Sequence, residues 1–513
     1  MSGSQASLRK SRMGRLLAGL GIAAVALAGV ALVAYQYRHE ILKQVYMIRP
    51  IDDRPRAGAD DGFSILLVVL DACRADKVGA YGFDRETTPA MDELAADPDA
   101  AVFLNYYVQE TWTKPSTASL FTGVYPHEHG MVYGHLQAED PESDSNFRVQ
   151  KLSPDLATIA ELLGQSGFYT FGVVSPFQLG EDYGFDQGFA EYYDPPTEGG
   201  EGDDLRIRIT TALIPTIAGR FFGYIHMLGC HRPFPPEFRD AEYLSRYGSA
   251  YDEEARRREG VDFTEVSPLD RLIKDGEIEL ADDDVAFMNL LYESRLRWTD
   301  RELVAPIVQI LKDSGKYDDT LLIVTADHGE ELYDHRGYGH GHALWNEVIR
   351  PLLIVKYPKG AKPDGIGARV EDLVTSVDIV PSLLSLAGVD APEAARGTAT
   401  LAGEFGPDAY AYTENANCTL ENADVCHITA EWSLIRDGFK LIETDEETLL
   451  FNLNDDPGER RSLTSEMPEL VAEMKGVVAE LKERSTTAVS TSGTDQEMDD
   501  DAVKGLRGLG YVQ

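Results

Sequence analysis

Two uninterrupted apolar runs, each closed by an acidic residue, set the strongest limit on how this chain can fold. Residues 63–70 (FSILLVVL) end at Asp71, and residues 320–326 (TLLIVTA) end at Asp327-His328. Apolar runs without alternation are typical of parallel strands buried on both faces. Between them, strands are expected at 101–108, 169–174 and 221–227, and helices at 89–96, 155–165 and 283–313. This rhythm predicts an α/β domain over residues 63–404, with a doubly wound sheet and helices on both faces.

The pattern changes after about residue 405. Short apolar runs at 432–435, 440–442 and 449–451 are separated by Asp-Gly and Glu-rich turns, and a helical pattern follows at 467–483. We expect a small antiparallel sheet and a helix over residues 405–484. Residues 485–513 are Ser/Thr-rich and then acidic, a composition that predicts a mobile segment and a C-terminal tail.

The first 62 residues read as a membrane anchor and its flanks. Residues 1–15 are a basic segment, residues 16–35 are almost purely apolar, and residues 36–62 carry the charge, Pro and Gly of a linker. The apolar stretch approaches the ~20 residues that a membrane-spanning helix needs. Basic residues before it predict a cytoplasmic amino terminus and a single-pass protein with an extracytoplasmic catalytic domain, periplasmic or at the cell surface. A cleaved signal peptide is the alternative, but such signals have shorter apolar cores.

Charge restricts the partners of the chain. It has 87 acidic and 47 basic residues among 513, for a formal net charge of -40. Such a field repels phosphate backbones and anionic lipid surfaces, so nucleic acid is excluded as a partner. The charge is interpreted as a solvated acidic surface, with steering of a cationic substrate as the alternative.

The four cysteines form neither a CxxC pair nor a zinc-binding spacing. Cys418 and Cys426 are close together in a polar segment of an exported domain, where a disulfide between them is one of two open alternatives. Cys73 and Cys230 are expected to be small buried residues near strand ends.

The acidic and imidazole groups at the strand ends predict a metal site. Ligands of an open α/β sheet collect beyond the carboxyl ends of its strands, so Asp71 and the Asp327-His328 pair should converge there. Two carboxylates and an imidazole suit calcium, magnesium, manganese or zinc, and the Thr113 oxygen could complete the set. Any one of these residues alone could be a cap or a turn residue. Together they favour one divalent metal ion.

Thr113 is the expected nucleophile. It precedes a helical pattern, and a hydroxyl bound to a divalent cation has a depressed pKa. The positive end of the helix would favour an anionic ester. Lys114 is next to it and is expected to pair with substrate, with a merely solvated side chain as the alternative.

Histidines in two loops are further catalytic candidates. His231 and His342 are expected to bind ester oxygens or to protonate the leaving group, and the alternative for each is a hydrogen-bonded loop histidine. His340 has the same two interpretations. His127 and His129 are expected to order the turn after the nucleophile helix.

Eight motifs, in this order, resemble the sulfatase family of the alkaline phosphatase superfamily. They are LVVLDACRADKVGAYG (67–82), WTKPSTASLFTG (112–123), TADHGE (325–330), GHGHALW (339–345), RPLLI (350–354), VDIVPSLL (377–384), NDDPGER (454–460) and LRGLGYV (506–512). The resemblance implies an alkaline-phosphatase-like fold. It also implies Asp71, Asp327 and His328 as metal ligands. By the same resemblance, Thr113 is the nucleophile and His231 and His342 are substrate-side groups.

Three parts of the chain depart from the family pattern. The usual nucleophile motif is Cys/Ser-x-Pro-Ser-Arg, but here Thr113 and Thr117 occupy the first and last positions. The cysteine that family members convert to formylglycine is therefore absent, and we expect no formylglycine. Ala72 stands where many sulfatases carry a second carboxylate, and residues 175–179 (SPFQL) replace a Lys-Trp-His segment.

The resemblance therefore implies a Thr-nucleophile variant of the family, similar to membrane-anchored bacterial phosphoethanolamine and glycerol-phosphate transferases. We predict a membrane-anchored, metal-dependent hydrolase or transferase with a covalent Thr113 intermediate. A phosphate ester or diester is favoured over a sulfate ester. The substrate is expected to be an anionic ester such as an envelope glycan or a lipid head group. The alternatives are a sulfuric ester hydrolase and an inactive sulfatase-fold binding protein.

Overall fold

The computed structural model describes residues 56–57, 62–131, 135–137, 147–194, 201–248, 251, 253–264, 269–422, 425–485 and 496–497. The basic segment 1–15, the apolar segment 16–35, most of the linker and most of the segment 485–513 lie outside these residues, so the expectations for them stay predictions. No helix within the described ranges is long and apolar enough to cross a membrane.

The core of the fold is an eight-stranded sheet in the order β14-β3-β13-β10-β2-β9-β6-β7. Its strands are β2 (Ser64–Leu70), β3 (Ala100–Tyr107), β6 (Tyr169–Val174), β7 (Glu191–Tyr193), β9 (Phe221–Met227), β10 (Thr320–Thr325), β13 (Leu353–Lys356) and β14 (Arg369–Thr375). All neighbours pair in parallel except β13, which is antiparallel to both β10 and β3. Every side chain of β2 and β10 is buried, as expected for central strands covered on both faces.

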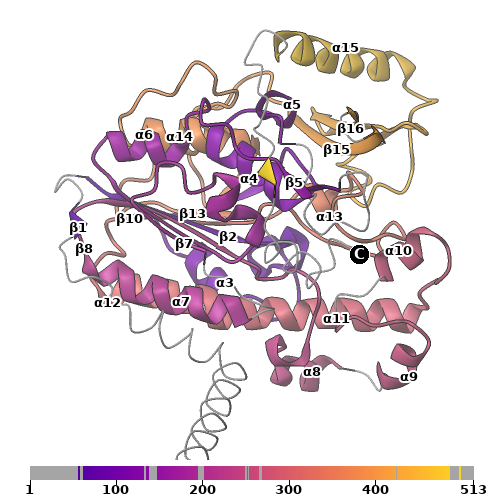
Figure 1. Ribbon diagram of the computed structural model, residues 1–513, viewed down its shortest axis with the longest axis horizontal. Coiled ribbons are helices and arrows are strands. Elements are labelled where there is room, and N and C mark those ends of the chain that lie inside the picture. The colour runs from indigo at the N-terminus through magenta and orange to yellow at the C-terminus, as the bar shows by residue number, and fades with distance from the viewer. Residues whose placement is uncertain are drawn as a thin grey trace, which may run out of the picture. The chain divides into compact units, whose positions relative to one another are not determined.

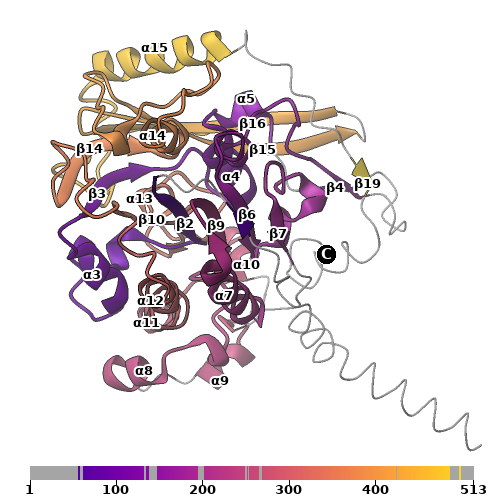
Figure 2. The same ribbon diagram turned by 90° about the vertical axis from the view of Figure 1, so that its left-hand side faces the viewer.

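Helices cover both faces of this sheet (Figures 1 and 2). One face carries α3 (Pro89–Ala95), α7 (Glu201–Leu213), α11 (Asp282–Thr299) and α12 (Ala305–Asp313), and the other carries α4 (Thr113–Thr122), α6 (Ile159–Gln165) and α14 (Ile379–Leu386). The single helix expected over 283–313 is interrupted by a π-helical turn at Asp300–Val304. The predicted doubly wound α/β sheet is confirmed.

The C-terminal part adds a four-stranded antiparallel sheet. Its strands are β15 (Ala411–Asn422), β16 (Val425–Arg436), β17 (Phe439–Glu443) and β18 (Thr448–Asn452), and α15 (Pro468–Ser485) follows. Met474, Val478 and Leu481 of α15 pack with Trp432 and Leu434 of β16 in one apolar cluster. The small antiparallel sheet and its helix are thus confirmed, with a first hairpin longer than the apolar runs predict.

Shorter elements complete the fold. They are β1 (Arg56–Ala57), β4 (His135–Gln137), β5 (Phe147–Val149), β8 (Ile217–Ala218), β11 (Glu331–Leu332), β12 (Tyr338–Gly339), β19 (Gln496–Glu497), α5 (Pro126–His129), α8 (Ala241–Tyr247), α9 (Glu253–Arg258), α10 (Leu269–Lys274) and α13 (Asn346–Ile349). Cys73 and Cys230 are free and buried near strand ends, as expected. Residues 416–422 and 425–430 are described only by their backbone, so a Cys418–Cys426 disulfide stays a prediction.

Candidate active site

Polar side chains from three segments meet at the carboxyl edge of the central sheet. Asp71 directly follows β2, and Asp327 and His328 lie just after β10. Thr113 is the first residue of α4. Asp71, Asp327 and His328 each offer one ligand atom, and these three atoms lie within 4.8 Å of one another. The fold thus brings Asp71, Asp327 and His328 together at this edge, as the sequence predicts.

The Thr113 hydroxyl lies among these groups. Its Oγ1 is 3.5 Å from Asp71 Oδ2, to which it can donate, and 3.3 Å from His328 Nε2. His328 Nδ1 lies 2.8 Å from the carbonyl oxygen of Gly329, which can only accept a hydrogen bond. The proton of the neutral ring is therefore on Nδ1, and Nε2 presents a lone pair to Thr113 and the carboxylates.

The two carboxylates fit a divalent cation. Asp71 Oδ1 and Asp327 Oδ2 are buried and accept no hydrogen bond. They lie 3.5 and 3.6 Å from the His328 Nε2 lone pair. Buried carboxylate oxygens without donors are costly, whereas a cation would satisfy both of them and the imidazole together. Asp71, Asp327 and His328 are the residues that would hold it.

The pKa shifts of Asp71 and Asp327 also fit a bound cation. Burial, together with repulsion from Asp327 and Glu330, raises the pKa of Asp71 well above its usual value. Burial also acts to raise the pKa of Asp327, but attraction to His328 and His226 outweighs it and the net pKa is lowered. Two close buried carboxylates without a cation cannot both carry a full charge, so their pKa values move apart.

The backbone around these ligands is tightly constrained. Ala72 adopts φ 58°, a strained conformation for a residue with a side chain, and its N–H points toward Asp327 Oδ1 at 3.4 Å. A Cβ on Gly329 would lie 1.9 Å from the Glu347 carbonyl oxygen, so only glycine fits after His328. Ser116 Oγ donates to the Asp327 carbonyl at 2.6 Å and ties the first turn of α4 to the ligand loop.

Two further histidines stack next to His328. The ring centroids of His328 and His340 are 4.3 Å apart, and those of His340 and His231 are 4.9 Å apart. His340 Nδ1 is 2.7 Å from Glu330 Oε1. Burial, aided by neighbouring His340, lowers the pKa of His231 to about 3. His231 is therefore a neutral imidazole at pH 7, not the imidazolium that would protonate a leaving group.

The other two predicted catalytic residues lie in different surroundings. His342 Nε2 is 3.0 Å from Glu331 Oε2, and no described contact joins it to Thr113 or to the three ligands. Lys114 is fully buried, and its Nζ lies 4.9 Å from the centroid of the Tyr183 ring. Roles for both residues therefore stay predictions, and the structure points to His340 rather than His342 as the histidine near the ligands.

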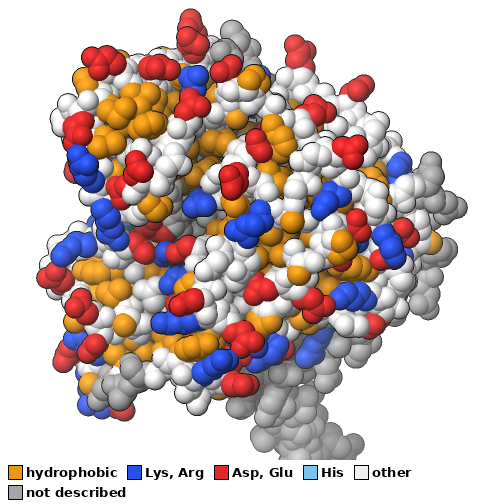
Figure 3. Space-filling model, turned by 180° about the vertical axis from the view of Figure 1, so that it is seen from behind, with side chains coloured by type: hydrophobic (Ala, Val, Ile, Leu, Met, Phe, Trp, Pro, Cys, Tyr) orange, Lys and Arg blue, Asp and Glu red, His pale blue; other side chains and the backbone are white. Residues whose placement is uncertain are grey.

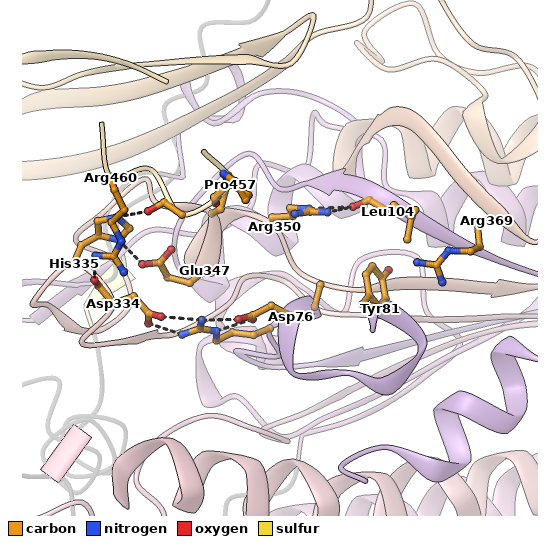
Figure 4. A pocket seen from close by; sticks show the side chains of 14 residues that line it. Asp76, Tyr81, Leu104, Asp334, His335, Glu347, Arg350, Arg369, Pro457 and Arg460 are labelled. Atoms are coloured by element: carbon orange, nitrogen blue, oxygen red, sulfur yellow. Dashed lines mark hydrogen bonds and ion pairs between the residues drawn. The ribbon is translucent and has the colours of Figure 1, made fainter. Parts of the chain in front are cut away.

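A second His-carboxylate group lies beside a separate pocket. Glu331, His335 and Glu347 have ligand-type atoms within 4.8 Å of one another. His335 Nδ1 is already 2.6 Å from Glu347 Oε1, and its ring stacks on Trp345. The neighbouring pocket of about 350 Å³ is lined by His335, Glu347 and four arginines, among other side chains (Figure 4). None of the predicted site residues lines it, so it is not the predicted centre.

His226, Tyr224 and Glu330 are residues near the site that the sequence patterns did not single out. His226 is buried in β9, the neighbour of β2, and its Nε2 is 3.5 Å from Asp327 Oδ2. The signal that could have revealed it is a single imidazole near the carboxyl end of an otherwise apolar strand, FFGYIHM.

Surface charge is mixed on the face drawn in Figure 3. There, Lys and Arg side chains of the described residues are interspersed with Asp and Glu side chains. Such a distribution offers no continuous basic track on that face for a phosphate backbone.

A doubly wound sheet with this carboxylate-histidine group at its carboxyl edge defines the alkaline-phosphatase-like class of α/β hydrolases. The model of the family described as Sulfatase matches residues 64–389, more than half of the chain. The chain therefore belongs to the sulfatase family. A second model, described as the C-terminal part of N-sulphoglucosamine sulphohydrolase, matches residues 332–487.

Curated relatives are distant. The chain is 22% identical over 376 residues to an uncharacterized sulfatase of Escherichia coli K12, covering 66% of this chain and 70% of the relative. It is 26% identical to human arylsulfatase A over 64% of this chain and 65% of the relative. It is 24% identical to a multifunctional alkaline phosphatase superfamily protein of Trinickia caryophylli, over 66% of this chain and 76% of the relative.

Solved structures share the fold at low identity. A 2-O GAG sulfatase matches with a TM-score of 0.62 and 18% identity, over 83% of this chain and 93% of that one. The phosphonate monoester hydrolase of Agrobacterium radiobacter matches with a TM-score of 0.62 and 18% identity, over 85% of this chain and 100% of that one. The predicted family resemblance is confirmed, and the chain is a sulfatase-fold enzyme that acts on ester bonds.

Proposed function

We propose that this chain cleaves or transfers an anionic ester through a covalent intermediate on Thr113, with a phosphate ester or diester favoured over a sulfate ester. The observation that carries the proposal is the position of the Thr113 hydroxyl, 3.5 Å from Asp71 Oδ2 and 3.3 Å from His328 Nε2 at the start of α4. A hydroxyl that served only the core would not need a carboxylate and an imidazole beside it.

In the proposed reaction, Thr113 Oγ1 forms a bond to phosphorus as the bond from phosphorus to the leaving oxygen breaks. Asp71 Oδ2, 3.5 Å from Thr113 Oγ1, is a carboxylate oxygen placed to accept the Thr113 proton. A divalent cation held by Asp71, Asp327 and His328 would supply a lower hydroxyl pKa and attraction for the anionic ester. The positive end of the dipole of the ten-residue helix α4 favours the same anion.

The Thr113 ester must then be released. The oxygen of water or of an acceptor hydroxyl forms a bond to phosphorus as the bond from phosphorus to Thr113 Oγ1 breaks, and the proton taken up by Asp71 returns to Oγ1. Neutral His231 can accept a hydrogen bond from the attacking hydroxyl. The His340 ring lies between the rings of His231 and His328, and its Nδ1 is hydrogen-bonded to Glu330 Oε1. Water as the acceptor gives a hydrolase, and a hydroxyl of an envelope glycan or lipid head group gives a transferase.

The preference for phosphorus rests on the residue at position 113. The family resemblance implies that formylglycine enzymes release sulfate through a geminal diol. Threonine cannot form such a diol. The phosphoryl ester of threonine has a route to hydrolysis, and its more highly charged transition state gains more from a dication. The fold is compatible with this chemistry, since its structural neighbours include phosphonate monoester hydrolases as well as sulfatases.

A sulfuric ester hydrolase is the second candidate function. It is favoured by the match of residues 332–487 to the C-terminal part of a sulphohydrolase and by structural likeness to a protein bound to D-glucosamine-2-N,6-O-disulfate. A binding protein without turnover is less well supported, because it has no need of metal-ligating carboxylates beside a hydroxyl.

Location is also a proposal. Residues 16–35, with the basic residues before them, support a single-pass anchor that leaves the catalytic domain outside the cytoplasm. Protease digestion of the catalytic domain in intact spheroplasts supports this topology, and full protection of the domain contradicts it.

The substrate class is tested with one leaving group and four esters. The purified protein, saturated in turn with Ca²⁺, Mg²⁺, Mn²⁺ and Zn²⁺, is assayed on 4-nitrophenyl phosphate, phosphodiester, phosphonate and sulfate. We expect kcat/KM for the phosphate or diester to exceed that for the sulfate by about tenfold or more. A higher kcat/KM for the sulfate at saturating metal contradicts the phosphate preference and favours the sulfuric ester hydrolase.

A further inference from the structure

His226 lies between a tyrosine hydroxyl and a ligand carboxylate. Its Nδ1 is 2.7 Å from the Tyr224 hydroxyl, and its Nε2 is 3.5 Å from Asp327 Oδ2. The His226 side chain is fully buried, and neither its Nε2 nor Asp327 Oδ2 has a hydrogen-bond partner. These two atoms are therefore buried, unsatisfied and 3.5 Å apart.

The Tyr224 hydroxyl decides which nitrogen carries the proton. Burial and the charge of Asp327 raise the pKa of Tyr224 well above its usual value, so the phenol keeps its proton. If Tyr224 donates to Nδ1, the ring proton is on Nε2 and points at a carboxylate oxygen. The opposite tautomer would aim the Nε2 lone pair at the carboxylate, which is repulsive. The contacts thus favour an N–H aimed at Asp327.

The two oxygens of Asp327 have different surroundings. Oδ1 accepts from the His328 N–H at 3.0 Å and from the Ala72 N–H at 3.4 Å. Oδ2 has no backbone donor, and the His226 ring lies beside it. The backbone thus fixes one oxygen, and His226 is placed to fix the direction of the other, which belongs to the metal-ligating group.

We propose that His226 is a positioning residue for the metal site: its Nε2–H orients Asp327 Oδ2, and Tyr224 orients His226. This inference rests on the proposed function, because it assumes that Asp327 ligates a divalent cation. Groups that orient a ligand in this way typically change metal affinity by about 10–100-fold when removed.

Position 117 gives a reason for a histidine here. Thr117 is one helical turn after Thr113 on α4, and its Oγ1 is buried without a described hydrogen-bond partner. The motif of the family has an arginine at this position, whereas this chain has a short side chain there and two large polar side chains, Tyr224 and His226, on the facing strand. His226 therefore supplies a donor to the ligand group from β9, where the short Thr117 side chain supplies none to it in the described contacts.

The test measures metal binding rather than turnover. Metal-free wild type, His226→Ala, His226→Gln and Tyr224→Phe are titrated by calorimetry with Mn²⁺, Ca²⁺, Zn²⁺ and Mg²⁺, and each protein is also unfolded in urea with EDTA. His129→Ala is the matched control. His129 is likewise buried and bonded to a hydroxyl, with Nε2 3.0 Å from Ser119 Oγ, and it has no described contact with the ligands.

For the metal that wild type binds most tightly, we expect His226→Ala to raise Kd by about 10–100-fold. His226→Gln, whose amide N–H can replace Nε2–H, should recover most of the affinity, and Tyr224→Phe should lose a few-fold. His129→Ala should lower stability in urea but leave Kd within about twofold.

Three results overturn the positioning role. They are an unchanged Kd in folded His226→Ala, an equal loss of affinity in His129→Ala, and a glutamine variant no better than alanine. If the alanine variant does not fold, the glutamine and phenylalanine variants decide, and unchanged Kd values in both overturn the role. Wild type that binds none of the four cations instead refutes the metal site of the proposed function, and the positioning role with it.

Discussion

A buried ion pair within the C-terminal part, next to Asn346 of the catalytic domain, should be costly to break from one side. Lys440 Nζ of β17 is 2.6 Å from Glu459 Oε1, and both side chains are fully buried. Glu459 Oε2 accepts from the Asn346 N–H at 2.7 Å, at the start of α13. Lys440→Met would leave the carboxylate buried with its neutral donor alone. Removal of one partner from such a pair typically costs about 3–5 kcal/mol of unfolding free energy.

The assay is urea unfolding at pH 7, followed by tryptophan fluorescence. We expect Lys440→Met to lose about 3–5 kcal/mol, and the double variant Lys440→Met/Glu459→Gln to recover much of that loss, because no charge is then left unpaired. Lys312→Met is the control, since it removes an exposed pair with Glu93, 3.2 Å apart, and should leave the midpoint unchanged. A loss below about 1 kcal/mol in Lys440→Met would refute the reasoning, since it means that the pair is hydrated or not formed.

The remaining predictions concern the metal and pH. Asp327→Asn and His328→Ala should each lower the metal content measured by elemental analysis, because each removes one of few protein ligands, and stoichiometric metal in both variants contradicts the site. Burial lowers the pKa of His129 to about 3, so between pH 6.5 and 3 the unfolded chain binds a proton that the folded chain does not. The free energy of unfolding should therefore decrease as the pH is lowered from 6.5 to 3. In His129→Gln the slope should be smaller by up to about 1.4 kcal/mol per pH unit, and an unchanged slope in urea titrations contradicts a neutral buried imidazole.

Long apolar strands could be predicted from the sequence because burial on both faces leaves a simple pattern. The predicted runs at 169–174 and 221–227 coincide with β6 and β9. Strands β13 and β14 were not predicted, because one is only four residues long and the other, RVEDLVT, mixes exposed acidic residues with buried ones. Their short or mixed patterns depend on pairing with β3 and β10, which local sequence does not encode.

Some residues of the site could likewise be predicted from the sequence, and others could not. Asp71, Asp327 and His328 follow strands whose ends are evident, so their convergence could be predicted from topology. The sequence could not predict which of His340 and His342 lies near the ligands, because positive φ values at Gly339 and Gly341 set the course of that loop. The position of His226 beside Asp327 also could not be predicted, because contacts of a residue inside a strand depend on the adjacent strand and loop.

Lys114 shows a different limit of prediction from the sequence. Its place beside the expected nucleophile predicts a substrate contact, but on α4 the side chain of the next residue points about 100° away, here toward Tyr183. Proximity in sequence at the start of a helix therefore says little about which side chain faces the ligand.

The central claim is a covalent ester on Thr113, and trapping that ester tests it most directly. The protein is mixed with 4-nitrophenyl phosphate at saturating metal, quenched in acid within one turnover, digested and analysed by mass spectrometry. We predict a phosphoryl adduct on the peptide that contains Thr113 in wild type, and none in Thr113→Ala, which should remain folded but lose turnover. Activity of Thr113→Ala within a few-fold of wild type, or an adduct on another residue, contradicts the account.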